Sequence, residues 1–175
     1  MSSPVCQNIE IKARLADLES ARDICARLET PCAEVELQVD TYFDATAGRL
    51  KLREIQRQKS GTQAAELIGY QRPDQGAAKT SSYHRVELAP GDPMQALLSL
   101  VLPVRQVVVK RREIYLWKNV RVHLDEVEGL GLFLEFEAVV GPDCDVGLCR
   151  ERVDYLIEQF GLAPEDLIAH SYVDM

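Results

Sequence analysis

Six carboxylates lie at alternating positions of mixed apolar and polar segments, where they could hold a metal ion. They are Glu10, Asp40, Glu87, Asp125, Glu135 and Glu137. Side chains two residues apart on a β-strand project from the same face, so Glu135 and Glu137 would point together. Oxygen-only clusters of this kind suit Mg²⁺ or Mn²⁺, which keep several waters and also bind phosphate oxygens. The pattern therefore predicts a site for Mg²⁺ or Mn²⁺.

Basic residues share these polar faces and alternate with apolar neighbours in the same way. The clearest are Lys12, Lys51, Arg53, Arg85, Lys110 and Arg112. One such face alone is most simply explained as solvated surface, but nearly every predicted strand repeats the pattern. A basic cluster beside a carboxylate-held divalent ion is the chemistry of phosphoryl or nucleotidyl transfer, in which arginines bind phosphate in a bidentate manner.

Strands are the main elements that position these side chains. We predict them at Gln7–Arg14, Glu36–Phe43, Arg49–Ile55, Gln63–Arg72, Ser81–Leu88, Val104–Trp117, Val120–Val127 and Leu132–Val140. Their connections are mostly short and turn-like, which favours hairpins. Eight strands linked in this way predict an antiparallel sheet that closes or nearly closes.

Helical spacing of apolar residues indicates flanking helices. One helix follows a cap at Asp17, and another lies between Asp145 and Gly161. A shorter helix is expected from Pro93 to Leu102 with Asp92 as its N-cap, and Pro164 opens a last turn. The predicted fold is therefore α+β, an eight-stranded antiparallel β-barrel with flanking helices.

The helices and the charged strand faces together predict what the barrel encloses. If the helices cover the apolar outside, the charged faces line the inside. An eight-stranded barrel has room only for side chains or one small ligand. Buried cations need partners, and a bound polyanion would supply them.

Composition sets limits on partners and location. The 175 residues suit one domain spanning 1–175, and 46% are apolar. The formal net charge of −8 argues against nucleic acid and anionic membrane as partners. No run approaches the ~18 apolar residues of a membrane span, and the first residues do not resemble a signal peptide, so a cytoplasmic protein is expected. The five cysteines include no C-x-x-C pair and are expected to be reduced thiols.

Several segments resemble CYTH domains, the triphosphate tunnel metalloenzymes. Residues 8–12, Asn-Ile-Glu-Ile-Lys, are similar to the E-x-E-x-K signature of that family. Further matches, in family order, lie at residues 38–43, 50–53, 109–112, 124–137 and 171–174. The stretch 124–137 fits L-D-x-V-x-x-L-G-x-F-x-E-x-E and looks most like the class IV adenylyl cyclase branch. One departure is Asn8, where the signature has glutamate, and it weakens one metal site.

The resemblance implies a role for each matching residue. Metal ligands are expected at Glu10, Glu135 and Glu137. The triphosphate would be bound by Lys12, Lys51, Arg53, Arg85, Lys110 and Arg112, with Arg72 and Lys79 as weaker candidates because Lys79 is expected in a loop. Catalytic roles are expected for Glu10, Lys12 and Asp125, the last orienting a lysine or the attacking group. His123 is interpreted as a hydrogen-bonded inward residue, and His84 and His170 as surface residues.

Three functions remain open at this point. A class IV adenylyl cyclase would convert ATP to cAMP and pyrophosphate. A triphosphatase would hydrolyse tripolyphosphate, thiamine triphosphate or a nucleotide. A non-catalytic sensor of polyphosphate or nucleotide is the third. All three take a small-molecule triphosphate, and a homodimer is one option for the oligomeric state.

Overall fold

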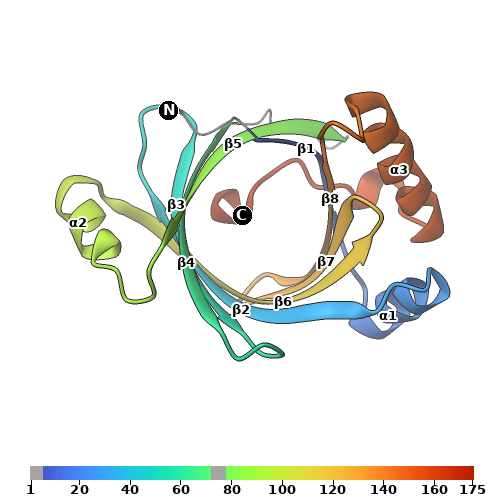
Figure 1. Ribbon diagram of the computed structural model, residues 1–175, viewed down its shortest axis with the longest axis horizontal. Coiled ribbons are helices and arrows are strands. Elements are labelled where there is room, and N and C mark those ends of the chain that lie inside the picture. Colours follow the sequence, from blue (N-terminus) through green and yellow to red (C-terminus); the bar gives the residue numbers. More distant parts are fainter. Residues whose placement is uncertain (1–5, 72–77) are drawn as a thin grey trace.

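The structure is a computed structural model that describes residues 6–71 and 78–175. Its eight strands form a closed barrel in the order β1-β5-β4-β3-β2-β6-β7-β8, and every pair is antiparallel. The strands are β1 (Cys6–Arg14), β2 (Cys32–Phe43), β3 (Arg49–Arg57), β4 (Gln63–Gln71), β5 (Lys79–Leu88), β6 (Val104–Trp117), β7 (Val120–Val127) and β8 (Gly131–Val139). Figure 1 shows the ring they form. The predicted α+β barrel is confirmed.

Alternation along each strand decides which side chains face the interior. On β7, for example, Val122 and Leu124 point outward into a hydrophobic core, while Arg121 and His123 line the interior. Hairpins join most neighbouring strands, but three pairings bring together strands that are distant in the sequence. β1 closes the ring between β5 and β8, and β2 pairs with β6. These pairings place residues of six or more segments around one space.

Two helices cover one side of the barrel. α1 (Leu18–Arg27) and α3 (Val146–Gln159) pack on the outside near β1, β7 and β8, as Figure 1 shows on its right. The predicted N-cap Asp17 is confirmed, since its side chain accepts a hydrogen bond from the Ser20 amide. Asp145, which precedes the other predicted helix, is also an N-cap and accepts a hydrogen bond from the Leu148 amide. Gly161 follows α3 with a φ of +62°, the left-handed conformation that glycine adopts without strain.

The third helix differs from its prediction. α2 (Met94–Val101) begins after Pro93, although the Asp92 carboxylate still accepts a hydrogen bond from the Met94 amide at 3.0 Å. None of its residues is buried, and it stands away from the barrel in Figure 1. The apolar outside is therefore covered at α1 and α3 but remains partly exposed on β2 and β6, for example at Leu37 and Val107.

The C-terminal residues turn into the barrel. After the 3₁₀ turn η1 (Pro164–Asp166), which begins at the predicted Pro164, the chain ends in η2 (Tyr172–Asp174). Figure 1 shows this end inside the ring of strands. Tyr172 packs edge-on against Phe133 and is 2% exposed. The hydroxyl of Tyr70 and that of Ser171 lie 3.1 Å apart, which ties the segment to β4.

Within the described residues, no helix is long and apolar enough to cross a membrane. The four cysteines whose side chains are described, Cys25, Cys32, Cys144 and Cys149, are free thiols.

Candidate active site in the barrel interior

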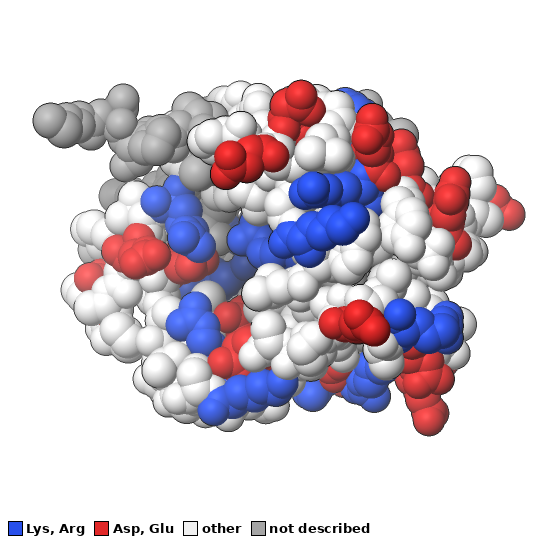
Figure 2. Space-filling model, turned by 45° about the vertical axis from the view of Figure 1, so that its right-hand side comes forward, with Lys and Arg blue, Asp and Glu red and all other residues white. Residues whose placement is uncertain are grey.

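The barrel encloses a cavity of about 300 Å³. Its described lining includes the cationic side chains Lys12, Lys51, Arg53, Arg57, Arg85, Lys110, Arg112 and Arg121. It also includes the carboxylates Glu10, Glu36, Glu66, Glu135 and Glu137. Figure 2 shows lysines and arginines gathered at and inside an opening in the surface. A cavity of this composition suits an anionic ligand together with a cation.

A buried aspartate on β2 organises one half of the cationic lining. Asp40 is fully buried, and its carboxylate accepts hydrogen bonds from Arg53 at 2.6 and 2.8 Å and from Lys51 at 2.9 Å. Lys110, which comes from β6, lies 3.3 Å from the same oxygen as Lys51. Burial alone would raise the pKa of Asp40, but the charges of Arg53, Lys110 and Lys51 hold that pKa well below its usual range. One carboxylate therefore positions three cations at the cavity wall.

The charged form of Lys110 is destabilised by its surroundings. Its pKa is lowered to about 7, mainly by burial. The charge of Asp40 raises this pKa, whereas the charges of Arg112 and Arg53 lower it. Its side chain is 3% exposed. A lysine with this pKa is partly neutral at physiological pH, and an anion beside it would return it to the charged form.

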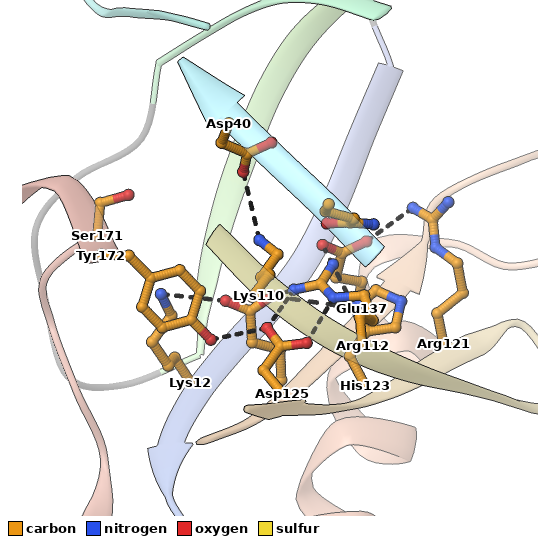
Figure 3. A network of polar contacts seen from close by, with 12 residues as sticks. Lys12, Asp40, Lys110, Arg112, Arg121, His123, Asp125, Glu137, Ser171 and Tyr172 are labelled. Carbon is orange, nitrogen blue, oxygen red and sulfur yellow. Dashed lines mark hydrogen bonds and ion pairs between the residues drawn. The ribbon is translucent and has the colours of Figure 1, made fainter. Parts of the chain in front are cut away.

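A second buried aspartate holds the other half of the lining. Asp125 on β7 is fully buried and accepts two hydrogen bonds from Arg112 at 2.7 and 2.6 Å. Its oxygen also accepts a hydrogen bond from the Tyr172 hydroxyl at 2.8 Å. Figure 3 shows this group together with Lys12, whose ammonium lies 3.1 Å from the centre of the Tyr172 ring. Both of its oxygens are engaged in this way, so Asp125 orients Arg112. The sequence had suggested that it orients a lysine or the attacking group, and the second role stays a prediction.

The carboxylates of β8 face these cations. In the register of the sheet, Glu137 lies between Glu10 on β1 and Arg121 on β7, and Glu135 lies between Lys12 and His123. Glu135 forms ion pairs with Lys12 at 3.1 Å and with Arg112. Glu137 pairs with Arg121 at 2.9 Å. Although burial opposes it, the charge of Arg121 and its neighbours lowers the pKa of Glu137 to about 2. Both glutamates are therefore ionised at neutral pH.

These carboxylates and a histidine form a cluster that fits a divalent ion. One donor atom each from His123, Glu135 and Glu137 lies within 4.8 Å of the others. Burial, followed by the charge of Arg112, lowers the pKa of His123, so its imidazole is neutral at neutral pH. Among the described residues, the Asn8 side-chain oxygen has no hydrogen-bond partner and is buried at the same end of the site. Carboxylates with uncommitted buried donors beside them are a suitable donor set for Mg²⁺ or Mn²⁺.

The structure brings together most of the predicted site residues. Glu10, Lys12, Lys51, Arg53, Lys110, Arg112, Glu135 and Glu137 all line the cavity. Arg85 lines it nearer the solvent, since its side chain is 45% exposed and pairs with Glu66. Glu10 is not part of the described donor cluster around His123, and its role as a metal ligand stays a prediction. Arg72 falls outside the described residues.

Three sequence-based expectations are wrong in detail. Lys79 lies in β5 rather than in a loop, and its ammonium donates to the Ala169 carbonyl at 2.8 Å, so it anchors the C-terminal segment. Glu87 was expected among the inward carboxylates, but its side chain is 80% exposed near the end of β5 and does not line the cavity. His123 is inward as expected, but its Nδ1 has no hydrogen-bond partner among the described residues.

Sequence reasoning assigned no role to several residues of the lining, among them Tyr172, Arg57, Arg121, Glu36 and Glu66. Tyr172 was part of a family-like segment without an assigned role, and it contacts both Lys12 and Asp125. Arg57 shares the inward face of β3 with Lys51 and Arg53 and pairs with Glu36 at 3.0 Å. Its position at an even spacing from Lys51 and Arg53 was a signal that could have found it.

The fold and the site define a closed β-barrel with a charged interior. In this interior, carboxylates lie beside lysine and arginine side chains and form the candidate binding site. A model of the CYTH domain family matches residues 7–172, and the chain belongs to this family. The protein named "Putative adenylate cyclase MJ0240" from Methanocaldococcus jannaschii is 21% identical over 173 residues, covering 95% of this chain and 97% of that protein.

Solved structures share the fold. The PH1012 protein from Pyrococcus horikoshii OT3 superposes with a TM-score of 0.81 at 25% identity, covering 95% of this chain and 98% of that one. HpAC1 from Hippeastrum, described as revealing a dominant triphosphatase activity, superposes with a TM-score of 0.56 at 19% identity, covering 94% and 91% of the two chains.

Proposed function

We propose that this protein is a divalent-metal-dependent enzyme that binds a triphosphate inside its barrel. The observation that carries the proposal is the arrangement of paired acidic and basic side chains around one cavity. Asp40 and Asp125, both fully buried, hold Lys51, Arg53, Lys110 and Arg112 in place opposite the Glu135–Glu137 pair. Cations anchored in this way need little reorganisation to bind phosphate oxygens.

The charge of the site is consistent with this ligand. Within the described lining, eight lysines and arginines face five glutamates, and Asp40 and Asp125 lie behind them. The protein groups are thus close to balanced, and a divalent ion on the glutamates leaves the cations to a polyanion. A bound Mg²⁺ or Mn²⁺ would polarise phosphate oxygens and neutralise charge that develops on them.

We place cyclisation of ATP to cAMP and pyrophosphate first among the reactions. The stretch 124–137, which resembles the class IV cyclases, supports this choice, as does the name of the archaeal relative. In that reaction the ribose 3′-hydroxyl attacks the α-phosphorus. Arg112 and Lys12 would bind oxygens of the triphosphate, while Glu10 lines the cavity where it can accept a proton.

A triphosphatase is the second candidate, and the distribution of charge favours it. Cations line the cavity from the buried Lys110 to the half-exposed Arg85, so a triphosphate could make contacts at several positions. The activity described for HpAC1 points the same way for that protein. Water would then attack the terminal phosphorus, and tripolyphosphate or thiamine triphosphate would serve as well as a nucleotide.

Product analysis separates these reactions. The protein is incubated with ATP, tripolyphosphate or thiamine triphosphate, each with Mg²⁺ and with Mn²⁺, and the Glu137→Gln variant serves as a control for contaminating phosphatase. cAMP with pyrophosphate supports the cyclase, and orthophosphate supports the hydrolase. Binding without any product would leave a non-catalytic sensor, and neither binding nor product would refute the triphosphate site.

A further inference from the structure

The imidazole of His123 is buried without a partner for one of its nitrogens. The side chain is 4% exposed on the inner wall of β7. Its Nδ1 has no hydrogen-bond partner among the described residues. A polar atom buried in this way costs free energy, and in native proteins it usually has a ligand, water or ion as its partner. Figure 3 shows the ring among the charged side chains of the site.

Two carboxylates lie near this nitrogen at separations that are too long for hydrogen bonds. Nδ1 is 3.9 Å from Glu135 Oε2 and 4.0 Å from Glu137 Oε1. Donor atoms of one six-coordinate ion, each about 2.1 Å from it, lie roughly 3.0 Å apart when adjacent and about 4.2 Å apart when opposite. Both nitrogen–oxygen separations fall within this range, and one donor atom of each of the three residues lies within 4.8 Å of the others. Side-chain rotations would therefore bring the three donors onto one ion, and Glu135 Oε2 would then release the hydrogen bond that it accepts from Arg112.

The donor set differs from a site built from oxygen alone. Asn8 supplies an uncharged oxygen where a family signature has a carboxylate, while β7 contributes a nitrogen directly across from Glu135. Mg²⁺ demands oxygen ligands in a near-ideal octahedron. First-row transition ions accept imidazole nitrogen more readily, so a nitrogen in this position changes which ion the site prefers.

We propose that Nδ1 of His123 is a protein ligand of the divalent ion beside Glu135 and Glu137, and that it makes the site select Mn²⁺ over Mg²⁺. The inference rests on the proposed function, because it concerns the metal of the same site. It assigns His123 a binding role in place of the structural one expected from the sequence.

Mn²⁺ is itself the probe for this proposal because it is paramagnetic. The full chain is titrated with Mn²⁺, and free ion is measured by electron paramagnetic resonance. Electron spin-echo modulation of the bound ion then reports any directly coordinated nitrogen. We expect ¹⁴N modulation in the wild-type protein, converted to a ¹⁵N pattern when the protein is grown with ¹⁵N-labelled histidine. The spin-echo measurement with labelled histidine uses the wild-type protein, so it does not depend on the folding of a variant.

Substitutions then assign the nitrogen. His123→Asn places an oxygen near the position of Nδ1, so it should retain a weaker site without nitrogen modulation. Its preference for Mn²⁺ over Mg²⁺ in competition titrations should fall by roughly tenfold, the lower end of the effect of altering groups around metal ligands. His84→Asn is the matched control, because His84 is exposed on β5, and it should change neither quantity.

The outcomes separate this inference from the proposed function. Bound Mn²⁺ without nitrogen modulation, or an unchanged ion preference in a folded His123→Asn protein, would overturn the role of His123 and leave the triphosphate site intact. Failure to bind Mn²⁺ at all, with and without tripolyphosphate, would overturn both.

Discussion

Lys110 should take up a proton when the protein binds a triphosphate. Its pKa is about 7, because burial and the neighbouring arginines oppose its charge. An anion beside the ammonium removes that opposition and returns the pKa towards the ordinary lysine value of about 10.4. Below pH 7 the lysine is already charged and binding takes up no proton. Above pH 7 it is neutral in the free protein, so binding must charge it and affinity falls as pH rises.

The size of the effect follows from the same pKa. At pH 8.5 the free lysine is about 1.5 units above its pKa, so charging it costs about 2 kcal/mol, or roughly 30-fold in affinity. Proton uptake should be about half a proton at pH 7 and nearly one at pH 8.5. Lys110→Arg is the informative variant, because arginine stays charged throughout this range and needs no proton. Lys118→Arg, at an exposed turn position, is the matched control.

Calorimetry with tripolyphosphate, in the absence of metal, measures this uptake. Titrations in buffers of different ionisation enthalpy give the number of protons bound at each pH. The ligand has ionisations of its own, but these are common to all the proteins and cancel in the comparison. Equal proton uptake by wild type and Lys110→Arg at pH 8.5 would show that Lys110 is charged in the free protein, and would refute the reasoning.

Three further substitutions test other parts of the site. Asp40→Asn leaves three cations without their buried partner and should lower the free energy of unfolding by about 3–5 kcal/mol; denaturation should show partial rescue by tripolyphosphate, whereas the exposed Asp44→Asn should have little effect. Glu135→Gln should lower the turnover rate, because it removes several kcal/mol of transition-state stabilisation. Circular dichroism should show an intact fold, and an unchanged rate at low Mg²⁺ would contradict the metal assignment. Asn8→Glu should lower the metal concentration needed for half-maximal activity, and identical metal titrations would show that position 8 does not contact the ion.

The barrel could be predicted from the sequence because its information is local. Strand alternation fixes which side chains share a face, and short turns fix which strands are neighbours. Within the described residues, alternation holds along the strands with errors of a few residues at their ends, and the rule for short turns holds for the strands that are consecutive in sequence. Lys79 shows the limit of predicting strand ends, because β5 begins at Lys79, two residues before the predicted strand. Glu87 shows another, because alternation predicts a side of the sheet but not the depth along the barrel.

The partners across the cavity could not be predicted, because they depend on contacts without a local signature. Asp40 meets Lys110 only because β2 pairs with β6, although 70 positions separate the two residues. Tyr172 reaches Asp125 because the C-terminal segment turns into the ring. The alternation of β7 predicts that His123 faces inward, but only the closed register places it near both Glu135 and Glu137.

The ion pairs of the cavity lining lead us to expect that binding of the metal ion and binding of the triphosphate are coupled. Glu135 and Glu137 are now engaged with Lys12, Arg112 and Arg121. An ion bound by these glutamates must weaken those pairs, and the freed cations then lack an anionic partner in a buried site, which is costly. A triphosphate removes that cost, so each ligand favours the other by the same free energy. Asp40 and Asp125 keep Lys51, Arg53, Lys110 and Arg112 in place meanwhile, because their carboxylates lie behind the lining. We therefore expect the buried aspartates to position the cations, and the glutamates that face the cavity to exchange their cationic partners for a metal ion.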